Sequence, residues 1–334
     1  MCPYKLYGKK LYAARRFRHT LSRNDVGTAR PNLGGRMTKR NTLSTATGEE
    51  PVPSGIGRYS ILARLSNHKS TAVYRAFDGV NKRDVCIKQL TVVGSKSRSA
   101  TASMEREVRF GRKLSHPGLV EVYDYVTDTP RHYFVMEYFA PGATLNAVFL
   151  GDPPPFRPPP LKIVLLQTAE TLAYLHSQGL VHRDIKPENV LINEVGAIKV
   201  IDLSVAFERE NRLSVWRRLL GGKQRVVGTR SYMPPEQIEG RDVDGRADLY
   251  SFGVMMFELL AGRPPFVANN EDALLAKHIK DRPPTLNQVR PEVTPEASKM
   301  VERLLAKDPG QRYQKAEDLV YFLNKTKLRT TDKD

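Results

Sequence analysis

Residues 182–202 read HRDIKPENVLINEVGAIKVID. Two short runs rich in Val and Ile, residues 190–192 and 197–201, are separated by the turn-forming residues 193–196. β-branched residues on both sides of a short turn predict a β-hairpin. Closing this hairpin brings its two open ends together, so the residues that flank it should become neighbours.

The flanking residues are of the types that phosphate chemistry uses. Asn189 precedes the first strand and Asp202 follows the second, while Asp184 lies five residues before Asn189 in a polar loop. Amide and carboxylate oxygens are hard ligands that suit Mg²⁺ when phosphates also bind it. A separate Asp could accept a proton from a hydroxyl, and Lys186 adds positive charge where phosphate charge would build up.

The composition excludes several classes of protein. The chain has 334 residues, of which 40% are hydrophobic and 27% charged, so it can bury a sizeable core. This excludes a wholly disordered chain, a collagen-like repeat and a multi-span membrane protein, and no apolar run reaches the roughly 18 residues that span a bilayer. Two cysteines, Cys2 and Cys86, favour a reducing compartment. The first residues lack the apolar core of a secretory signal, so we expect a cytoplasmic protein.

Residues 1–57 form a basic extension. They hold 11 Lys or Arg and 3 Asp or Glu, which is about half of the net charge of +17. Few large aliphatic residues follow Leu21 here, which predicts disorder. Three interpretations stay open: a solvated extension without a dedicated partner, a tail that binds an acidic partner, and an organelle transit peptide. Nucleic-acid binding is disfavoured, because the segment has no aromatic-interleaved platform.

The rest of the chain changes from strand-like to helix-like patterns. Val, Ile, Tyr and Phe are enriched in five short runs, at residues 59–65, 71–77, 84–90, 120–126 and 132–138. These runs predict an antiparallel sheet, interrupted by one helix over about residues 99–114. Later apolar residues recur with helical spacing, which predicts helices over about residues 161–175 and 247–261. The order indicates an α+β fold in which a β-rich part precedes a mostly helical part.

Residues 182–189 resemble the catalytic loop H-R-D-x-K-P-x-N of the eukaryotic-type protein kinases, and other motifs of that family follow in order. Val85-Cys-Ile-Lys88 resembles the V-A-I-K strand. Asp202-Leu-Ser204 stands where the family has D-F-G, and residues 228–236 end in P-P-E where the family has A-P-E. The ordered set is far more specific than any one motif.

The resemblance covers about residues 58–325 and extends to bacterial members of the family. It implies a bilobal protein-kinase fold: a five-stranded antiparallel sheet with one helix in residues 58–138, then a larger, mostly α-helical lobe in residues 139–325. Residues 326–334 would form a short polar tail. Lys186 implies a serine/threonine protein kinase, which transfers the γ-phosphate of ATP to Ser or Thr hydroxyls of a protein substrate.

The same resemblance implies the catalytic and metal-binding roles. Asp184 would accept or orient the proton of the substrate hydroxyl, and Lys186 would stabilise the transferring group. Asn189 and Asp202 would hold Mg²⁺, with Mn²⁺ as an alternative metal. Lys88 would contact the α- and β-phosphates of ATP.

The nucleotide pocket follows from the resemblance too. Glu107 would pair with Lys88, Met136 would be the gatekeeper, and the backbone of Glu137 and Phe139 would meet adenine. The other residues that the resemblance places around the nucleotide are Val73, Cys86, Leu191, Ser66 and His68.

Three residues would have regulatory roles. Arg183 would contact a phosphate on the activation segment, where Ser214 is the candidate acceptor among several basic residues. An unmodified Ser214 hydroxyl is the alternative interpretation. Thr229 would hydrogen-bond near Asp184.

Three more would have structural roles. Glu236, at the end of the activation segment, would pair with Arg312. Asp248 would lie on a buried helix and anchor the catalytic loop.

The phosphate-covering loop departs from the family. The family expects G-x-G-x-x-G between the first two strands, but the three glycine positions are Ser66, His68 and Thr71. Glycine lets a backbone approach phosphates closely, so its loss should weaken or reshape ATP binding. The alternative function is therefore a pseudokinase, a nucleotide-binding scaffold with weak or no phosphoryl transfer. The complete set of charged catalytic residues favours the active kinase.

Overall fold

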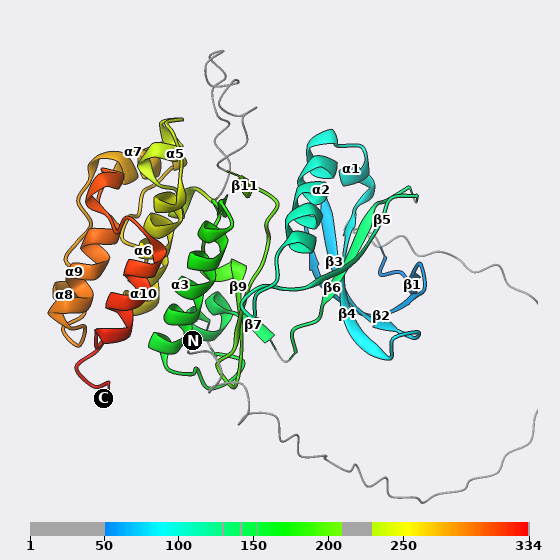
Figure 1. Cartoon of the computed structure of the whole chain (residues 1–334), viewed down its shortest axis with the longest axis horizontal. Coiled ribbons are helices and arrows are strands. Elements are labelled where there is room, and N and C mark those ends of the chain that lie inside the picture. The colour runs from blue at the N-terminus through cyan, green and yellow to red at the C-terminus, as the bar shows by residue number, and fades with distance from the viewer. Residues whose placement is uncertain (1–50, 129, 141, 152, 209–228, 333–334) are drawn as a thin grey trace, which may run out of the picture. The chain divides into compact units, whose positions relative to one another are not determined.

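A curled antiparallel sheet forms the first part of the fold, which we call the N-lobe (Figure 1). The computed structural model describes residues 51–128, 130–140, 142–151, 153–208 and 229–332, and within these ranges six strands join in the order β1-β2-β3-β4-β6-β5. The strands are β1 Gly55–Ile56, β2 Tyr59–Asn67, β3 Thr71–Asp78, β4 Arg83–Leu90, β5 Val122–Val126 and β6 Tyr133–Glu137. Along β3, buried residues alternate with half-buried ones, as expected for a strand with one face on a core.

The sheet differs from the sequence-based expectation of five strands. The added strand β1 pairs with the start of β2, Gly55 opposite Ser60. It lies inside residues 1–57, which the sequence assigned to the extension, so the ordered sheet begins earlier than expected. Two residues are too short to show a strand periodicity, and the neighbouring glycines and prolines are typical of turns.

Two helices follow β4. The short helix α1, Val92–Ser95, precedes α2, Arg98–Lys113, whose first turn is capped by the Ser97 side chain. Figure 1 shows α2 lying along the sheet near β5. This close approach depends on Gly111, because a Cβ there would lie 2.4 Å from the Val122 side chain.

The second part, the C-lobe, is mostly helical (Figure 1). Its α-helices in the described residues are α3 Leu161–Ser177, α5 Pro235–Ile238, α6 Gly245–Ala261, α7 Glu271–Lys280, α8 Leu286–Val289, α9 Pro295–Leu304 and α10 Ala316–Lys325. Shorter helical turns are the π-helical Asn146–Leu150 and the 3-10 turns Pro187–Asn189, Arg230–Tyr232 and Pro309–Gln311.

Helix α6 forms the centre of the C-lobe. It is buried along nearly its whole length, as its continuous apolar sequence indicates. Asp244 caps its start by accepting a hydrogen bond from the Arg246 N–H at 3.0 Å. Gly262 ends it in the left-handed conformation, with φ of 74°, where glycine is favoured.

Two small sheets of the C-lobe carry the segment that bears the catalytic motif. The strands of the first are β7 Gly142–Thr144, β9 Val190–Asn193 and β10 Ile198–Val200, and those of the second are β8 Leu180–Val181 and β11 Phe207–Glu208. In the first sheet, β9 pairs with β10 and with β7, both antiparallel. The β9–β10 pair is the hairpin that residues 190–201 predict. Together with the N-lobe sheet and the mostly helical C-lobe, it confirms the bilobal α+β fold.

Within the polar segment after α10, one apolar residue packs on the C-lobe. Leu328 is buried, its carbonyl accepts a hydrogen bond from the Thr294 N–H at 3.0 Å, and Arg329 forms a bridge with Val293. One apolar residue in a polar segment gave no periodic signal. In the described ranges, we find no helix whose length and apolarity would suit a membrane span.

Candidate active site

One buried carboxylate, Asp248 of α6, holds the backbone of the catalytic loop in place. Its two oxygens accept hydrogen bonds from the backbone N–H of His182 at 2.9 Å and of Arg183 at 2.8 Å. His176, near the end of α3, makes a third contact through Nε2 at 2.9 Å. Arg183 adopts a positive φ of 66°, a strained conformation for a residue with a side chain, and the bonds to Asp248 hold it there. Burial alone would raise the pKa of Asp248, but the hydrogen bonds and nearby histidines keep it below its usual value.

Asp184 lies at the centre of a polar cluster. One of its oxygens accepts a hydrogen bond from the Thr229 N–H at 2.8 Å. The other lies 2.8 Å from Lys186 Nζ and accepts a bond from Asn189 Nδ2 at 2.9 Å. Lys186 Nζ also donates to the Thr229 hydroxyl. These contacts fix the carboxylate, the ammonium group and the amide with respect to one another.

The hairpin brings Asn189 next to the segment that holds Asp202. The Asn189 carbonyl accepts a hydrogen bond from the Ile201 N–H at 2.9 Å, although Asn189 and Asp202 are 13 residues apart in the sequence. Asn189 Nδ2 donates to the Asp184 carbonyl and carboxylate. Its Oδ1 is therefore the side-chain atom that suits a metal ion.

Lys88 connects α2 with Asp202. Its Nζ lies 2.6 Å from Glu107 Oε2 and 3.6 Å from Asp202 Oδ1. Burial would lower the pKa of Lys88, but the two carboxylates outweigh it and raise the pKa above the usual value. Burial likewise would raise the pKa of Asp202, yet Lys88 and the Ser204 N–H lower it to about 2. At neutral pH Asp202 is thus ionised, as a metal ligand must be.

One face of the N-lobe sheet carries four of the residues assigned to the nucleotide. Val73 is directly opposite Lys88, and Cys86 is directly opposite Met136; opposite residues of an antiparallel pair share a face. Burial raises the pKa of the Cys86 thiol to about 12. The thiol therefore stays protonated at neutral pH and is not a reactive nucleophile. Met136 lines a pocket of about 20 Å³ together with Glu107 and Asp202.

The other nucleotide candidates occupy the edges of this region. The Glu137 N–H donates to the Glu121 carbonyl at 2.8 Å, and its carboxylate lies 2.8 Å from Lys199 Nζ. Phe139 and Leu191 are half-buried, Leu191 at the centre of the three-stranded sheet. Ser66 is half-buried opposite Val73, and His68 is exposed at the end of the hairpin.

The segment after Asp202 is tied to α2 and to Arg183. Arg106 donates to the Ser204 carbonyl at 2.7 Å. Arg183 donates through Nε to the Val205 carbonyl at 2.8 Å, and its guanidinium lies 4.9 Å from the centre of the Phe207 ring. Ser214, the expected phosphate acceptor, lies outside the described residues.

Glu236 and Arg312 form a buried ion pair. The guanidinium makes two bonds to the carboxylate, at 2.6 and 2.8 Å, and both side chains are almost fully buried, with exposures of 0% and 2%. Arg312 also donates to the backbone carbonyls of Ala306, Arg246 and Lys307. The pair therefore ties the end of the activation segment to the loop before α10.

His176 and Arg106 are residues that the motif search missed. His176 is the next-to-last residue of α3, and Arg106 directly precedes Glu107. The helix also carries Lys162, Gln167 and Glu170, so a polar residue there is no signal by itself, and the partner of His176, Asp248, lies 72 residues later. No sequence spacing indicates that contact.

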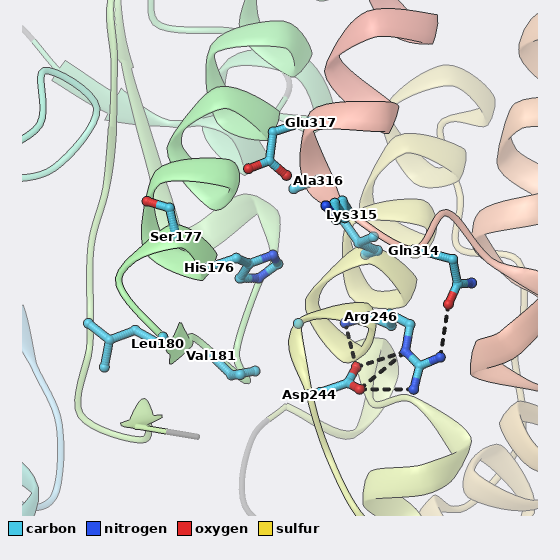
Figure 2. A pocket seen from close by; sticks show the side chains of 13 residues that line it. His176, Ser177, Leu180, Val181, Asp244, Arg246, Gln314, Lys315, Ala316 and Glu317 are labelled. Carbon is cyan, nitrogen blue, oxygen red and sulfur yellow. Dashed lines mark hydrogen bonds and ion pairs between the residues drawn. The ribbon is translucent and has the colours of Figure 1, made fainter. Parts of the chain in front are cut away.

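A larger pocket lies away from the residues assigned to catalysis, metal and nucleotide. It has a volume of about 520 Å³ and lies where the end of α3 meets the starts of α6 and α10. Figure 2 shows Arg246 bound to Asp244 and Gln314 on its wall. None of the residues assigned to catalysis, metal or nucleotide lines it, so the candidate active site is the Asp184 cluster and not the larger cavity.

The chain matches the protein kinase domain family over residues 59–321. It is 36% identical over 277 residues to a probable serine/threonine-protein kinase of Streptomyces coelicolor, covering 81% of this chain and 40% of that protein. It is 32% identical over 266 residues to the serine/threonine-protein kinase PknB of Mycolicibacterium smegmatis, covering 78% and 42%. It is also 32% identical over 263 residues to the serine/threonine-protein kinase PrkC of Bacillus subtilis, covering 79% and 39%.

The chain thus spans about two fifths of the length of these curated relatives. The family match extends over more than half of the chain and includes every element that holds the Asp184 cluster. The relatives are named as serine/threonine kinases, and they give the pseudokinase alternative no support. The ordered motifs, the geometry of the site and this match together show the family. The chain belongs to the protein kinase family, which includes the serine/threonine kinases of these bacteria.

Proposed function

We propose that the chain transfers the γ-phosphate of ATP to Ser or Thr hydroxyls of a protein substrate. The observation that carries this proposal is the Asp184 cluster, in which Lys186 Nζ and Asn189 Nδ2 lie 2.8 and 2.9 Å from the same oxygen of the Asp184 carboxylate. Protein kinases use ATP, typically with Mg²⁺. A cluster of this kind can position a hydroxyl and neutralise phosphate charge, which is most of what phosphoryl transfer requires.

Each residue has a separate task in this proposal. Asp184 accepts or orients the proton of the attacking hydroxyl. Lys186, held by Asp184 and Thr229, stabilises negative charge on the transferring group. Lys88, held by Glu107, positions the α- and β-phosphates.

The metal site fits the donor atoms that the chain provides. Asn189 Oδ1 and the ionised Asp202 carboxylate would hold Mg²⁺, or Mn²⁺, which supplies positive charge to the phosphates. The low pKa of Asp202 supports this assignment.

The adenine end of the pocket is assigned to the N-lobe sheet and the segment after it. Val73, Cys86 and Met136 share the face that carries Lys88, while the backbone of Glu137 and Phe139 would meet the base. Leu191 would close the pocket from the C-lobe, and Ser66 and His68 would lie toward the phosphates.

Regulation and location stay proposals. Phosphorylation of Ser214 would give Arg183 an anion to bind in place of the Val205 carbonyl.

A protein with a Ser or Thr acceptor is the expected partner, and an acidic partner for residues 1–57 stays a hypothesis. The cytoplasmic location also stays a prediction from the sequence.

Intact-mass spectrometry with Mg-ATP tests the proposal. The full chain and an Asp184→Asn variant are each incubated with Mg-ATP and a generic Ser/Thr protein substrate. We expect added phosphate on the chain or the substrate with the wild type, and at least about a hundredfold less with the variant. An exposed acid of the N-lobe, Asp128, provides the control variant Asp128→Asn, which should behave as the wild type.

Two outcomes would contradict active transfer. Thermal stabilisation by Mg-ATP without any phosphate transfer would indicate a nucleotide-binding scaffold. Equal transfer by the wild type and Asp184→Asn would indicate a contaminating kinase.

A further inference from the structure

The hairpin between β2 and β3 forms without glycine. Its end is closed by a hydrogen bond from the His68 N–H to the Thr71 carbonyl at 2.8 Å, with Asn67 opposite Ala72. No residue from Ser66 to Thr71 has a positive φ. The three substitutions at the glycine positions therefore cause no backbone strain here.

Instead, the tip of this hairpin is held by two residues that belong to no kinase motif. Thr91 Oγ1 donates to the Lys69 carbonyl at 2.7 Å, and the Thr91 N–H donates to the Ser70 carbonyl at 3.0 Å. Gly94 lies directly against the same carbonyl, since a Cβ on Gly94 would be 1.9 Å from Ser70 O. Thr91 and Gly94 are both buried, so these contacts are shielded from water. We call Thr91 and Gly94 the hairpin dock.

The hairpin dock lies at the end of the sheet where the phosphates are proposed to bind. Val73 is opposite Lys88, and Thr71 is opposite Leu90, so the hairpin tip begins just beyond Lys88. Thr91 follows β4 directly and starts α1. Helix α1 leads into α2, which carries Glu107. The dock thus joins the hairpin to the two elements that hold the Lys88–Glu107 ion pair.

We propose that Thr91 is a positioning residue for the phosphates of the bound nucleotide. This inference rests on the proposed kinase function. A glycine-rich loop loses much conformational freedom when it closes over a ligand. In this chain the hairpin is fixed in advance by Thr91 and by the space that Gly94 leaves, so less ordering is required on binding.

Two variants disturb the same contact in different ways. Thr91→Val removes the bond to Lys69 and also the cap that the hydroxyl provides by accepting from the Gly94 N–H at 3.0 Å. Gly94→Ala keeps that cap and favours helix, but pushes the Ser70 carbonyl away. If both variants have the same effect, the hairpin contact and not the stability of α1 is responsible.

Two further variants serve as controls. Thr91→Ser keeps the hydroxyl and should restore the wild-type behaviour. Ser95→Ala removes an exposed hydroxyl of the same short helix, which bonds only to the Val92 carbonyl at 3.0 Å within the described residues, and should have no effect. Thermal melting of each full-length variant shows whether it is folded.

The readout compares a ligand that has phosphates with one that has none. Calorimetry on the full chain measures binding of a non-hydrolysable Mg-ATP analogue and of adenosine, and steady-state assays give KM for ATP and kcat. In Thr91→Val and Gly94→Ala, we expect the Kd of the analogue and the KM to rise about fivefold, the effect of one lost hydrogen bond. Adenosine affinity and kcat at saturating ATP should change by less than about twofold.

Several outcomes would overturn the inference. An unchanged or lowered Kd for the analogue in both variants would show that the dock does not position the phosphate site. An equal loss of adenosine affinity would show a general effect on the N-lobe. If the wild type transfers phosphate and the variants bind normally, only this inference fails; if the wild type binds no nucleotide, the proposed function fails with it.

Discussion

The catalytic loop and the β2–β3 hairpin would act on the same nucleotide, but different kinds of contact hold them. The catalytic loop has the residue types of the family. Two of its backbone N–H groups donate hydrogen bonds to the buried Asp248. The hairpin has lost all three glycine positions and is held at its tip by Thr91. In the first region the contacts come from motif residues, and in the second they come from residues outside any motif.

This difference follows from what each region has to provide. Phosphoryl transfer needs a carboxylate, an ammonium group and metal ligands at defined positions, and few side chains can supply them. A covering loop needs only its backbone in the right place. Several combinations of contacts can hold a backbone, so a hairpin without glycine can still fill this place.

The largest effect is expected at the metal-binding end of the catalytic region. Asp202→Asn removes the negative charge that would bind Mg²⁺ and that lies 3.6 Å from Lys88. Phosphate transfer should fall roughly thousandfold, since metal-ion stabilisation contributes several kcal/mol. Initial rates with labelled ATP measure this, with Asp128→Asn as the control. Activity within about tenfold of the wild type would show that Asp202 is not the metal ligand.

The next effect concerns stability of the C-lobe. Arg312→Ala leaves Glu236 buried without its charged partner, and breaking such a pair typically costs about 3–5 kcal/mol. Denaturant unfolding of the full chain should show this loss. The exposed Arg282 gives the control, because Arg282→Ala should change the free energy of unfolding by less than about 0.5 kcal/mol. Similar values for both variants would contradict the structural role of the pair.

The free energy of unfolding should also depend on pH, through His278 of the C-lobe. Burial, together with the charge of Lys307, lowers the pKa of His278 to about 4 from 6.5. Between these values the unfolded chain takes up a proton that the folded chain does not, so the free energy of unfolding should fall as pH falls from 6.5 to 4. The slope from this group is at most about 1.4 kcal/mol per pH unit.

Substitution of each histidine tests this expectation. His278→Gln should flatten the decline in stability over that pH range. His68→Gln, in the exposed hairpin, should leave the decline as in the wild type. A decline that persists in full without His278 would assign it to other groups.

The smallest effect is expected from a glycine returned to the hairpin. His68→Gly should change the KM for ATP by less than about threefold and lower stability by at most about 1 kcal/mol, because the hairpin already forms without positive φ. Steady-state kinetics and thermal melting measure the two quantities. A KM lowered more than about tenfold would mean that the lost glycines do impair ATP binding, and would break the comparison between the two regions.

Local pattern predicted the parts of the molecule whose contacts are close in sequence. The β9–β10 hairpin, the long helices α3 and α6 and the strands β2 to β6 all have several residues of clear periodicity. The two-residue strand β1 and the docking of Leu328 were missed, because neither segment is long enough to show a period. The segment after α10 has the polar composition expected of a tail, but a single buried leucine, Leu328, decides where it packs.

The order of residues along the chain shows which chemical groups are available: Asp184, Lys186, Asn189 and Asp202 are all present, and phosphoryl transfer accepts few other residue types. How these groups are held depends on the packing of distant elements. The contact of His176 with Asp248 joins residues 72 positions apart, and that of Arg106 with Ser204 joins residues 98 positions apart. Such contacts depend on how helices and sheets pack, which leaves no period or spacing in the sequence. The hairpin dock is of the same kind, because Thr91 meets Lys69 only when β2, β3 and β4 have formed one sheet.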